Sequence, residues 1–392
     1  MDKKYLIVNT GSASKKYAFY VGDKEQAFFH FEKEGNGFIV TLKQDTGSEK
    51  SQITKNDFDK AIDYLLNILI KKAFISSIND INGIGVRTVA PGVYFEDNCL
   101  IDKQFLKHMK EAGKKAPLHV EAISEEINKL IKIFKNKVPV IGISDSTFHK
   151  SMPVKSKLYG INLNDAKKHE IYRYGYHGIS LGSIVNKLKA ENSLSEKIII
   201  CHIGGGVSIT AVKDGKSVDT TMGFTPLEGM IMATRVGDID SGALIYISEV
   251  LGLNGDKLKQ YLNKKCGLLG LSAGLSDDVR ELLKAENENM DAKNALDIYA
   301  YKIQKQIGAY MAALGGLDIL VFSGTVGERS FKMRERILGN LEGLGFVLDK
   351  NKNNATDNVD AVISTPESKI KIKVVKTDEM TQIARETREF IA

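Results

Sequence analysis

A strand, a loop of small residues and a second strand occur twice in this chain, and this repeat limits what the chain can fold into. Residues 4–8 are apolar and partly β-branched, residues 9–14 are small and polar, and residues 16–21 resume an apolar and aromatic strand pattern. The same order returns in residues 198–212, around the triple glycine at 204–206. Two such units, about two hundred residues apart, predict two related domains.

The remaining periodic segments predict an α/β protein. A third apolar strand is expected at residues 319–322, running into the small residues 323–327, with helical sequence from about residue 331. Three amphipathic stretches have apolar residues at helical spacing, namely 58–71, 120–134 and 292–314. Strands mixed with helices are typical of the α/β class. Because 392 residues exceed one compact core, we expect two domains with a boundary near residues 146–153.

Composition excludes several classes of function. Basic residues number 55 against 49 acidic ones, and no basic block interleaves with aromatic residues, so we expect no nucleic-acid partner. The N-terminal apolar run is too short for a signal peptide, and no apolar stretch approaches the ~18 residues of a membrane span. Three cysteines lie far apart without a CxxC pair, which favours reduced thiols in a cytoplasmic protein without a metal cluster.

Three loops of small residues follow strands and suit a phosphate. Backbone N–H groups must converge on a phosphate without bulky side chains in the way, and Gly and Ser in a turn allow this approach. The clearest is Gly204–Gly206; the others are residues 11–14, followed by Lys16, and residues 323–327. Any one of them could be a plain tight turn. The chain has neither a P-loop motif nor a GxGxxG that opens a helix, so a nucleotide site here would be of another type.

Long motifs connect the chain to a known family. The most diagnostic segment is residues 219–240, DTTMGFTPLEGMIMATRVGDID, and shorter motifs lie at 9–16, 116–119, 144–149, 173–178 and 377–385. Together they resemble the acetate kinase family, within the acetate and sugar kinase/Hsp70/actin superfamily, over nearly the full length. The resemblance implies a two-domain, actin-like α/β fold with a duplicated ribonuclease-H-like core. One domain would span 1–148 plus 380–392 and carry the carboxylate site; the other, 149–379, would carry the nucleotide site and the dimer interface.

The resemblance implies reversible, direct in-line transfer of the γ-phosphoryl group of ATP to acetate, giving acetyl phosphate and ADP. The cofactor would be Mg²⁺, with Mn²⁺ as an alternative, and the assembly a homodimer without membrane or nucleic-acid partners. The family's catalytic positions fall on Arg87, Asp145, His177 and Arg235, and its metal positions on Asn9 and Glu379.

The family's binding positions follow in the same way. The acid would be held by Arg87 in a pocket lined by Val89, Leu118, Tyr176 and Pro226. The ATP contacts would be Lys16, His202, Ile203, Gly204, Gly205, Gly206, Asp278, Val279, Arg280, Thr325, Val326, Gly327, Glu328 and Arg329.

This chemistry calls for cations more than for a base. A carboxylic acid with a pKa near ~4–5 is already ionised at neutral pH, so the difficulty is to bring two anions together. Arginine guanidinium groups, which can bind a carboxylate or phosphate through two parallel hydrogen bonds, and a histidine donor can offset the repulsion between the two anions. Without the resemblance, Arg87 reads as a surface arginine at a strand end and His177 as a packed structural residue. Asp145 would cap a turn.

Several positions depart from the family pattern and leave the substrate open. Val86, Ala90 and Pro91 surround Arg87 where the family has histidines and a glycine. Further departures are Gly205 for Asn, Tyr176 for Phe, Thr325 for Gly and Arg329 for Asn. The preferred acid and the donor, ATP or pyrophosphate, therefore remain open. A propionate or butyrate kinase is one alternative, and a non-catalytic ATP-binding regulatory module is another; Val89 favours a small acid.

Overall fold

The computed structural model describes residues 2–11, 14–35, 37–135 and 137–392, without the side chains of residues 118 and 119. The chain divides into two compact units. The first unit consists of Met1–Thr147 and Asp378–Ala392, and the second of Phe148–Thr377. The carboxylate-site and nucleotide-site roles assigned to the two domains stay predictions. In the described residues, no helix is both long and apolar enough to cross a membrane, and Cys99, Cys201 and Cys266 are free thiols.

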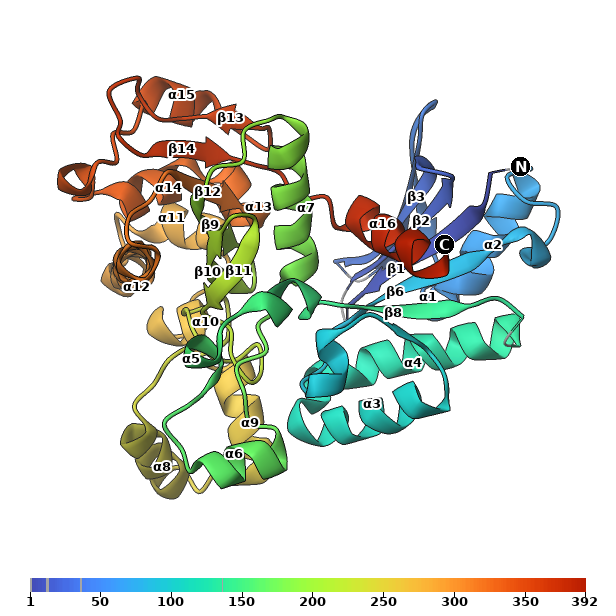
Figure 1. The fold of residues 1–392 in the computed structure, drawn as a ribbon, viewed down its shortest axis with the longest axis horizontal. Coiled ribbons are helices and arrows are strands. Elements are labelled where there is room, and N and C mark those ends of the chain that lie inside the picture. Colours follow the sequence, from blue (N-terminus) through green and yellow to red (C-terminus); the bar gives the residue numbers. More distant parts are fainter. Residues whose placement is uncertain (1, 12–13, 36, 136) are drawn as a thin grey trace. The chain divides into compact units, whose positions relative to one another are not determined.

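The described strands of the first unit form one mixed sheet in the order β5-β4-β3-β2-β1-β6-β8-β7 (Figure 1). Neighbours from β1 to β5 are antiparallel, β1, β6 and β8 are parallel, and β7 is antiparallel to β8. Their bounds are β1 Lys4–Thr10, β2 Ser14–Val21, β3 Lys24–Glu34, β4 Gly37–Gln44, β5 Gly47–Ile53, β6 Gly83–Thr88, β7 Cys99–Leu100 and β8 Val140–Ser144.

Helices cover both faces of this sheet. Their bounds are α1 Lys55–Asp59, α2 Ala61–Lys71, α3 Lys103–Lys115, α4 Pro117–Phe134 and α16 Glu379–Ile391. Leu6, Val8 and Ile84 point into the core beneath α2–α4, while alternate residues face α16. Helix α16 lies so close that a Cβ at Gly85 would stand 1.9 Å from Thr387 Oγ1. Glycine in β6 therefore permits the packing that brings Glu379 to the sheet.

The second unit repeats this arrangement, in the order β11-β10-β9-β12-β14-β13. Strands β9–β11 are antiparallel, and β12 and β14 add in parallel beside β9. The order β11-β10-β9-β12-β14 thus matches β3-β2-β1-β6-β8, which confirms the predicted α/β class with a duplicated core. The bounds are β9 Lys197–Ile203, β10 Val207–Lys213, β11 Lys216–Thr220, β12 Ile319–Ser323, β13 Ala361–Val362 and β14 Lys371–Val374.

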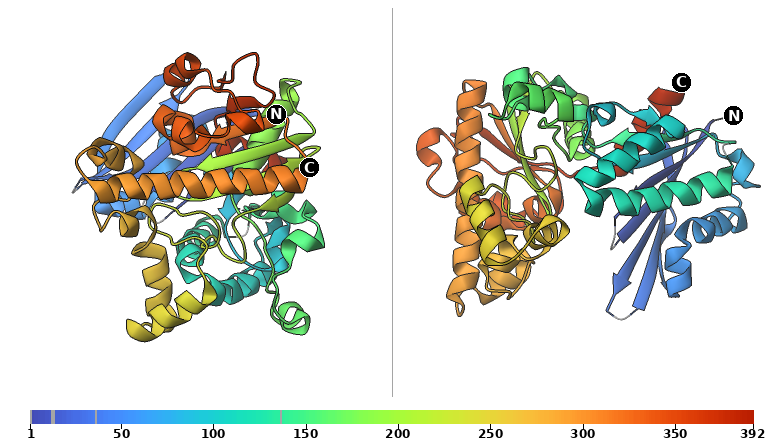
Figure 2. Two further views of the ribbon diagram at one scale, coloured as in Figure 1. Left: turned by 90° about the vertical axis from the view of Figure 1, so that its left-hand side faces the viewer. Right: turned by 90° about the horizontal axis from the view of Figure 1, so that it is seen from below.

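Helices also flank the second sheet. Helix α7 packs against β9, and its apolar residues join Ile198, Ile200 and Ile319 in one cluster. The long helix α12, orange in Figure 2, packs against β9 and β10. The bounds are α5 Val154–Lys157, α6 Leu163–His169, α7 Gly178–Ala190, α8 Ser241–Val250, α9 Gly255–Lys264, α10 Gly267–Leu271, α11 Val279–Ala285, α12 Met290–Leu314, α13 Gly324–Arg329, α14 Phe331–Leu338 and α15 Lys350–Ala355.

Two local predictions were wrong. The single helix expected over 58–71 is broken at Lys60, whose backbone (φ −102°, ψ 35°) ends α1, a helix that starts from a capping box at Thr54. The loop expected over 323–327 is helical from Gly324 onward. Gly324 adopts φ +73°, and a Cβ there would stand 2.8 Å from the Ile203 carbonyl oxygen. The glycine marks a tight strand-to-helix junction and not an open loop.

Candidate active-site clusters

Four predicted residues of the first unit form one hydrogen-bonded cluster. Asn9 lies near the end of β1, Arg87 in β6, Asp145 directly after β8 and Glu379 at the start of α16. Because β1, β6 and β8 are parallel, their carboxyl ends meet at one edge of the sheet, which explains how distant segments supply neighbouring side chains.

The cluster is centred on Arg87. Its Nη2 donates to Asp145 Oδ2 at 2.9 Å, and its Nη1 lies 3.3 Å from Asn9 Oδ1 and 3.5 Å from Glu379 Oε2. Asn9 Nδ2 donates to Glu379 Oε2 at 2.7 Å. Burial opposes the charge of Arg87, but the charges of Asp145 and Glu379 and the bond to Asp145 outweigh it and raise the pKa of Arg87 above its usual range.

These contacts bear on the simpler interpretations of the same residues. The Asp145 side chain is 1% exposed and engages Arg87, so its carboxylate does more than cap a turn. The cap of α16 is Asp378, which accepts from Thr381 N, and Glu379 is therefore not needed for that task. Arg87 lies inside the cluster, so it is not a loose surface arginine.

The cluster offers oxygen ligands to a hard cation. Asn9, Asp145 and Glu379 supply amide and carboxylate oxygens within a small region. Among the described residues, no group of three or more His, Cys, Asp or Glu side chains could hold a metal ion by itself. A hard cation such as Mg²⁺ usually takes one or two carboxylates and completes its shell with water and phosphate oxygens.

The second unit gathers His177 and Arg235 around the glycine turn. The turn joins β9 to β10 and is closed by Gly204 N donating to Gly206 O at 2.9 Å. A Cβ at Gly206 would lie 3.1 Å from His177 Nε2 and 3.6 Å from Arg235 Nη1. Glycine at this position therefore leaves room beside both side chains.

His177 is held in an unusual backbone conformation. It adopts φ +64° at the N-cap of α7, in the left-handed region where residues other than glycine are rare. Its Nδ1 lies 3.0 Å from Ser208 Oγ, and its ring centroid is 4.4 Å from that of His202. Such strain tends to persist at functional sites, where the surrounding structure enforces it.

Arg235 carries a charge that the described residues do not neutralise. Its Nη1 donates to Pro226 O at 3.0 Å and contacts Met232 Sδ at 3.3 Å, and none of the ion pairs among the described residues involves it. Burial lowers the pKa of Arg235 to about 10. A buried guanidinium without a carboxylate favours an anionic ligand.

The residues predicted to line the acid pocket belong to different units, and each is described within its own unit. In the second unit, Tyr176 is buried and its hydroxyl donates to Phe224 O at 2.8 Å. His149, fully buried, donates from Nε2 to Tyr176 O at 2.9 Å. In the first unit, Val89 packs at the edge of the main core. The side chain of Leu118, at the start of α4, lies outside the described ones.

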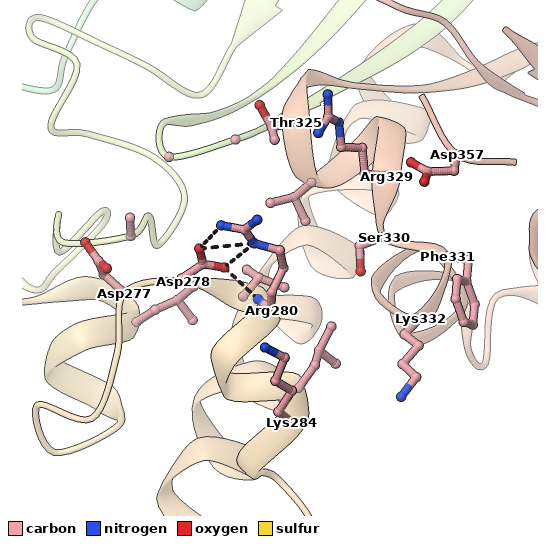
Figure 3. Close-up of a pocket in the computed structure, with 17 residues that line it drawn as sticks. Asp277, Asp278, Arg280, Lys284, Thr325, Arg329, Ser330, Phe331, Lys332 and Asp357 are labelled. Carbon is pink, nitrogen blue, oxygen red and sulfur yellow. Dashed lines mark hydrogen bonds and ion pairs between the residues drawn. The ribbon is translucent and has the colours of Figure 1, made fainter. Parts of the chain in front are cut away.

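A cavity of about 710 Å³ opens beside the glycine turn of the second unit (Figure 3). It lies between α11 and the segment α13–α14, with Asp357 at one side. Among the predicted ATP contacts, those that line it are Gly204, Gly205, Asp278, Val279, Arg280, Thr325, Val326 and Arg329.

Other predicted ATP contacts have different surroundings. Lys16 lies in the first unit, in β2, where it pairs with Asn9 across the sheet. His202 and Ile203 end β9, Gly206 belongs to the glycine turn, and Gly327 and Glu328 lie in α13. None of these five is among the described residues that line the cavity. Glu328 is buried, and its Oε1 accepts from Gly324 N at 3.0 Å and Thr377 N at 3.1 Å. Its carboxylate thus secures the start of α13.

The sequence did not reveal several residues of the cavity. Those not predicted include Lys284, Ser330, Phe331, Lys332 and Asp357. Ser208, the partner of His177, was also missed. Helical sequence was expected from about residue 331, where α14 lies, but α11 was not predicted, and nothing local indicated that these two helices border one cavity.

Comparison with known proteins agrees with this geometry. The sequence profile of the Acetokinase family matches residues 4–385. The acetate kinases of Bacteroides thetaiotaomicron and Thermotoga maritima are each 40% identical over 99% of this chain and 99% and 98% of their own. Among solved structures, a propionate kinase from Francisella tularensis is 33% identical with a TM-score of 0.88, covering 99% of both chains. The acetate kinase of Porphyromonas gingivalis is 34% identical with a TM-score of 0.85, covering 100% of both.

Proposed function

This chain belongs to the acetokinase family, and we propose on that basis that it transfers the γ-phosphoryl group of ATP to acetate, giving acetyl phosphate and ADP. It is then a phosphotransferase with a carboxyl group as acceptor. The family and the actin-like fold class predicted from the sequence are confirmed. The observation that carries the proposal is the partly buried guanidinium of Arg235, which has no carboxylate partner among the described residues and lies beside a glycine turn and a cavity of nucleotide size.

Arg235 and His177 suit the moving phosphoryl group. Its three equatorial oxygens carry negative charge through an in-line transfer, so fixed donors aimed at them lower the barrier. His177 Nε2 and Arg235 Nη1 both approach the position of a Cβ at Gly206, and a phosphoryl group on this turn would meet both. Pro226, whose carbonyl accepts from Arg235, would border the same place.

Arg87 suits the acetate carboxylate. We infer that its guanidinium, held by Asp145, presents a fork to the acid, and that the ionised acid attacks phosphorus directly without a phosphoenzyme. Asp145 then acts by fixing Arg87 and keeping it charged. Isolation of a phosphorylated Glu or His that forms and decays at the turnover rate would contradict direct transfer.

Asn9 and Glu379 would hold Mg²⁺, with Asp145 near enough to contribute. The ion would neutralise charge on the β- and γ-phosphates when bound. Lys16, opposite Asn9 in the neighbouring strand, carries a further cation on the same part of the sheet.

The donor is proposed to be a nucleotide and not pyrophosphate. A cavity of about 710 Å³ extends from Gly204 and Gly205 between α11 and α13. Pyrophosphate would occupy only the end at the glycine turn, whereas a nucleoside would fill the rest. Val279 and Val326 give that region apolar walls suited to a base.

An assay of the purified chain tests the reaction. ATP–Mg²⁺ should support phosphorylation of acetate, and comparison with formate, propionate and butyrate would rank the acids. A propionate kinase is the second candidate, because one solved relative carries that name. Activity with none of the four acids would contradict the proposal and favour a non-catalytic nucleotide-binding module.

Two variants test the arginine roles. Arg87→Ala and Arg235→Ala should each lower turnover by ~10²–10³, the usual loss for one preorganised charged donor, while ADP still binds. Lys350→Ala is the control, because this exposed cation of the second unit forms an ion pair with Glu335 at the surface and does not line the cavity. Near-wild-type turnover in either arginine variant would remove that residue from the mechanism.

We also propose a cytoplasmic homodimer formed through α8. This helix buries none of its residues within the chain, and Ile245, Tyr246, Val250 and the following Leu251 are each more than half exposed. An apolar surface of this kind is typical of a protein interface. A monomeric mass in solution at micromolar concentration, or an unchanged dimer in Ile245→Asp, would contradict this assignment.

A further inference from the structure

Arg329 and Asp357 stand together on one wall of the nucleotide cavity. Figure 3 shows them on the same side, Arg329 at the end of α13 and Asp357 just beyond α15. Both side chains are exposed. No ion pair and no side-chain hydrogen bond joins either of them to another described residue. A cation and an anion are thus both available to a ligand.

The backbone holds these two residues in a fixed relation. Arg334 is fully buried, and its Nη1 donates to Gly327 O and Glu328 O, at 2.9 and 3.1 Å, just before Arg329. Its Nη2 donates to Thr356 O at 2.8 Å, just before Asp357. Asn358 N also donates to Glu328 O at 3.1 Å. The guanidinium of Arg334 and one backbone hydrogen bond therefore hold the backbone at Arg329 next to the backbone at Asp357.

Among the described residues of the opposite wall, no guanidinium is free to donate two parallel hydrogen bonds to a ligand. Arg280 is engaged by Asp278, with Nη2 2.6 Å from Oδ2 and Nε 3.1 Å from Oδ1. Asp278 in turn caps α11. Lys284 pairs with Glu281. Arg329 is thus the guanidinium of this cavity that can offer two parallel donors to a ligand.

A guanidinium that donates two parallel hydrogen bonds, next to a carboxylate that accepts hydrogen bonds, complements the donors and acceptors along the edge of guanine. Guanine presents two acceptors, O6 and N7, which arginine binds in a bidentate manner. Next to them it carries two donors, N1–H and the 2-amino group, which suit a carboxylate. Adenine has an amino group in place of O6, so arginine would face a donor there and lose one of its two bonds.

We propose that this cavity binds guanine nucleotides alongside adenine nucleotides and binds them more tightly, with Arg329 on O6 and N7 and Asp357 on N1–H and the 2-amino group. The inference rests on the proposed function, which sets the phosphates at Gly204 and Gly205 and thereby the base farther along the cavity. Arg329 and Asp357 are specificity-determining residues in this assignment.

Calorimetric titration of the purified chain with GDP, ADP and IDP in Mg²⁺ tests it. GDP should bind roughly tenfold more tightly than ADP, a low value for one bidentate base contact. IDP, which keeps O6 and N1–H but lacks the 2-amino group, should lie between them. Tighter binding of ADP than of GDP would overturn the proposal.

Two variants separate base recognition from general attraction. Arg329→Lys keeps the positive charge but removes the guanidinium that donates two parallel hydrogen bonds. The affinity for GDP should therefore fall roughly tenfold, while the affinity for ADP changes little. Asp357→Asn should lower the affinity for GDP more than the affinity for IDP, and should leave the affinity for ADP unchanged. Equal weakening of GDP and ADP would overturn the base contacts, because it would indicate a phosphate contact for Arg329 or a ribose contact for Asp357.

Control variants and an activity assay distinguish a failure of the base assignment from a failure of the proposed reaction. Lys350→Gln and Glu342→Gln remove one charge each from exposed sites of the same unit outside the cavity and should leave the three affinities unchanged. If ATP supports acetyl phosphate formation but GDP has no advantage over ADP, only the base assignment fails. If GDP binds more tightly but no acid is phosphorylated with ATP or GTP, only the proposed reaction fails.

Discussion

Replacement of the buried Arg334 by methionine tests how the nucleotide cavity is built. The side chain is fully buried, and its guanidinium donates five hydrogen bonds to oxygens of residues 327, 328, 353 and 356. Burial lowers the pKa of Arg334 to about 10, and the charge of Asp357 partly offsets that effect. Methionine fills a similar volume but donates none of these five bonds. Glu328 O and Asn353 O keep a backbone donor, Asn358 N and Thr356 N, whereas the other three acceptors lose the donor that Arg334 supplies.

The expected loss follows from the three acceptors that lose their donor, namely Gly327 O, Asn353 Oδ1 and Thr356 O. A buried acceptor that loses its donor costs about 1–3 kcal/mol. The variant no longer has to bury a charge, and the new apolar side chain packs against its neighbours, so part of the cost is recovered. We expect a net loss of about 3–5 kcal/mol, comparable with breaking a buried charged contact. For a unit of this size, that corresponds to a melting temperature roughly 10 °C lower.

Thermal unfolding by circular dichroism or calorimetry measures this loss, since the chain has no tryptophan to report by fluorescence. Lys350→Met, which removes an exposed cation from the same unit, should shift the melting temperature by less than about 1 °C. In Arg334→Met, affinity for GDP should also fall, because Arg329 and Asp357 lose their common support. A shift of less than about 2 °C with unchanged nucleotide affinity would refute this account of Arg334.

Three further predictions concern the two clusters and the acid pocket. Glu379→Gln should raise the Mg²⁺ concentration needed for half-maximal rate by about tenfold or more, and an unchanged Mg²⁺ titration would exclude it as a ligand. His149→Leu should raise KM for acetate and lower stability by about 2–3 kcal/mol, because Tyr176 O loses its donor, with ADP affinity kept in a calorimetric titration. Val89→Ala should shift the kcat/KM ratio roughly tenfold towards propionate; an unchanged ratio would place the acid elsewhere.

Local signals in the sequence were enough for the framework of the fold. Runs of β-branched residues predicted β9, β10 and β12, and regular apolar spacing predicted α4 and α12, because backbone preference and side-chain period act over neighbouring residues. The break at Lys60 and the helix beginning at Gly324 escaped this reasoning. Both depend on backbone angles that the surrounding packing imposes, and residue type alone does not specify them.

The roles predicted for the site residues came from the resemblance to a family. The contacts among these residues became known only from the fold. Asn9 and Glu379 are 370 residues apart in the sequence and hydrogen-bonded, and Arg87 bonds to Asp145 over 58 residues, because the parallel strands end and α16 begins at one edge of a sheet. Nothing in the sequence marked Arg334 as buried or Asp357 as a wall of the nucleotide cavity. The sequence by itself determined which segments become strands, helices and glycine turns, since those preferences are local. Only the tertiary structure decided which charges neutralise each other and which, like Arg235 and Arg329, have no ion-pair partner among the described residues, because such pairing depends on distances between remote segments.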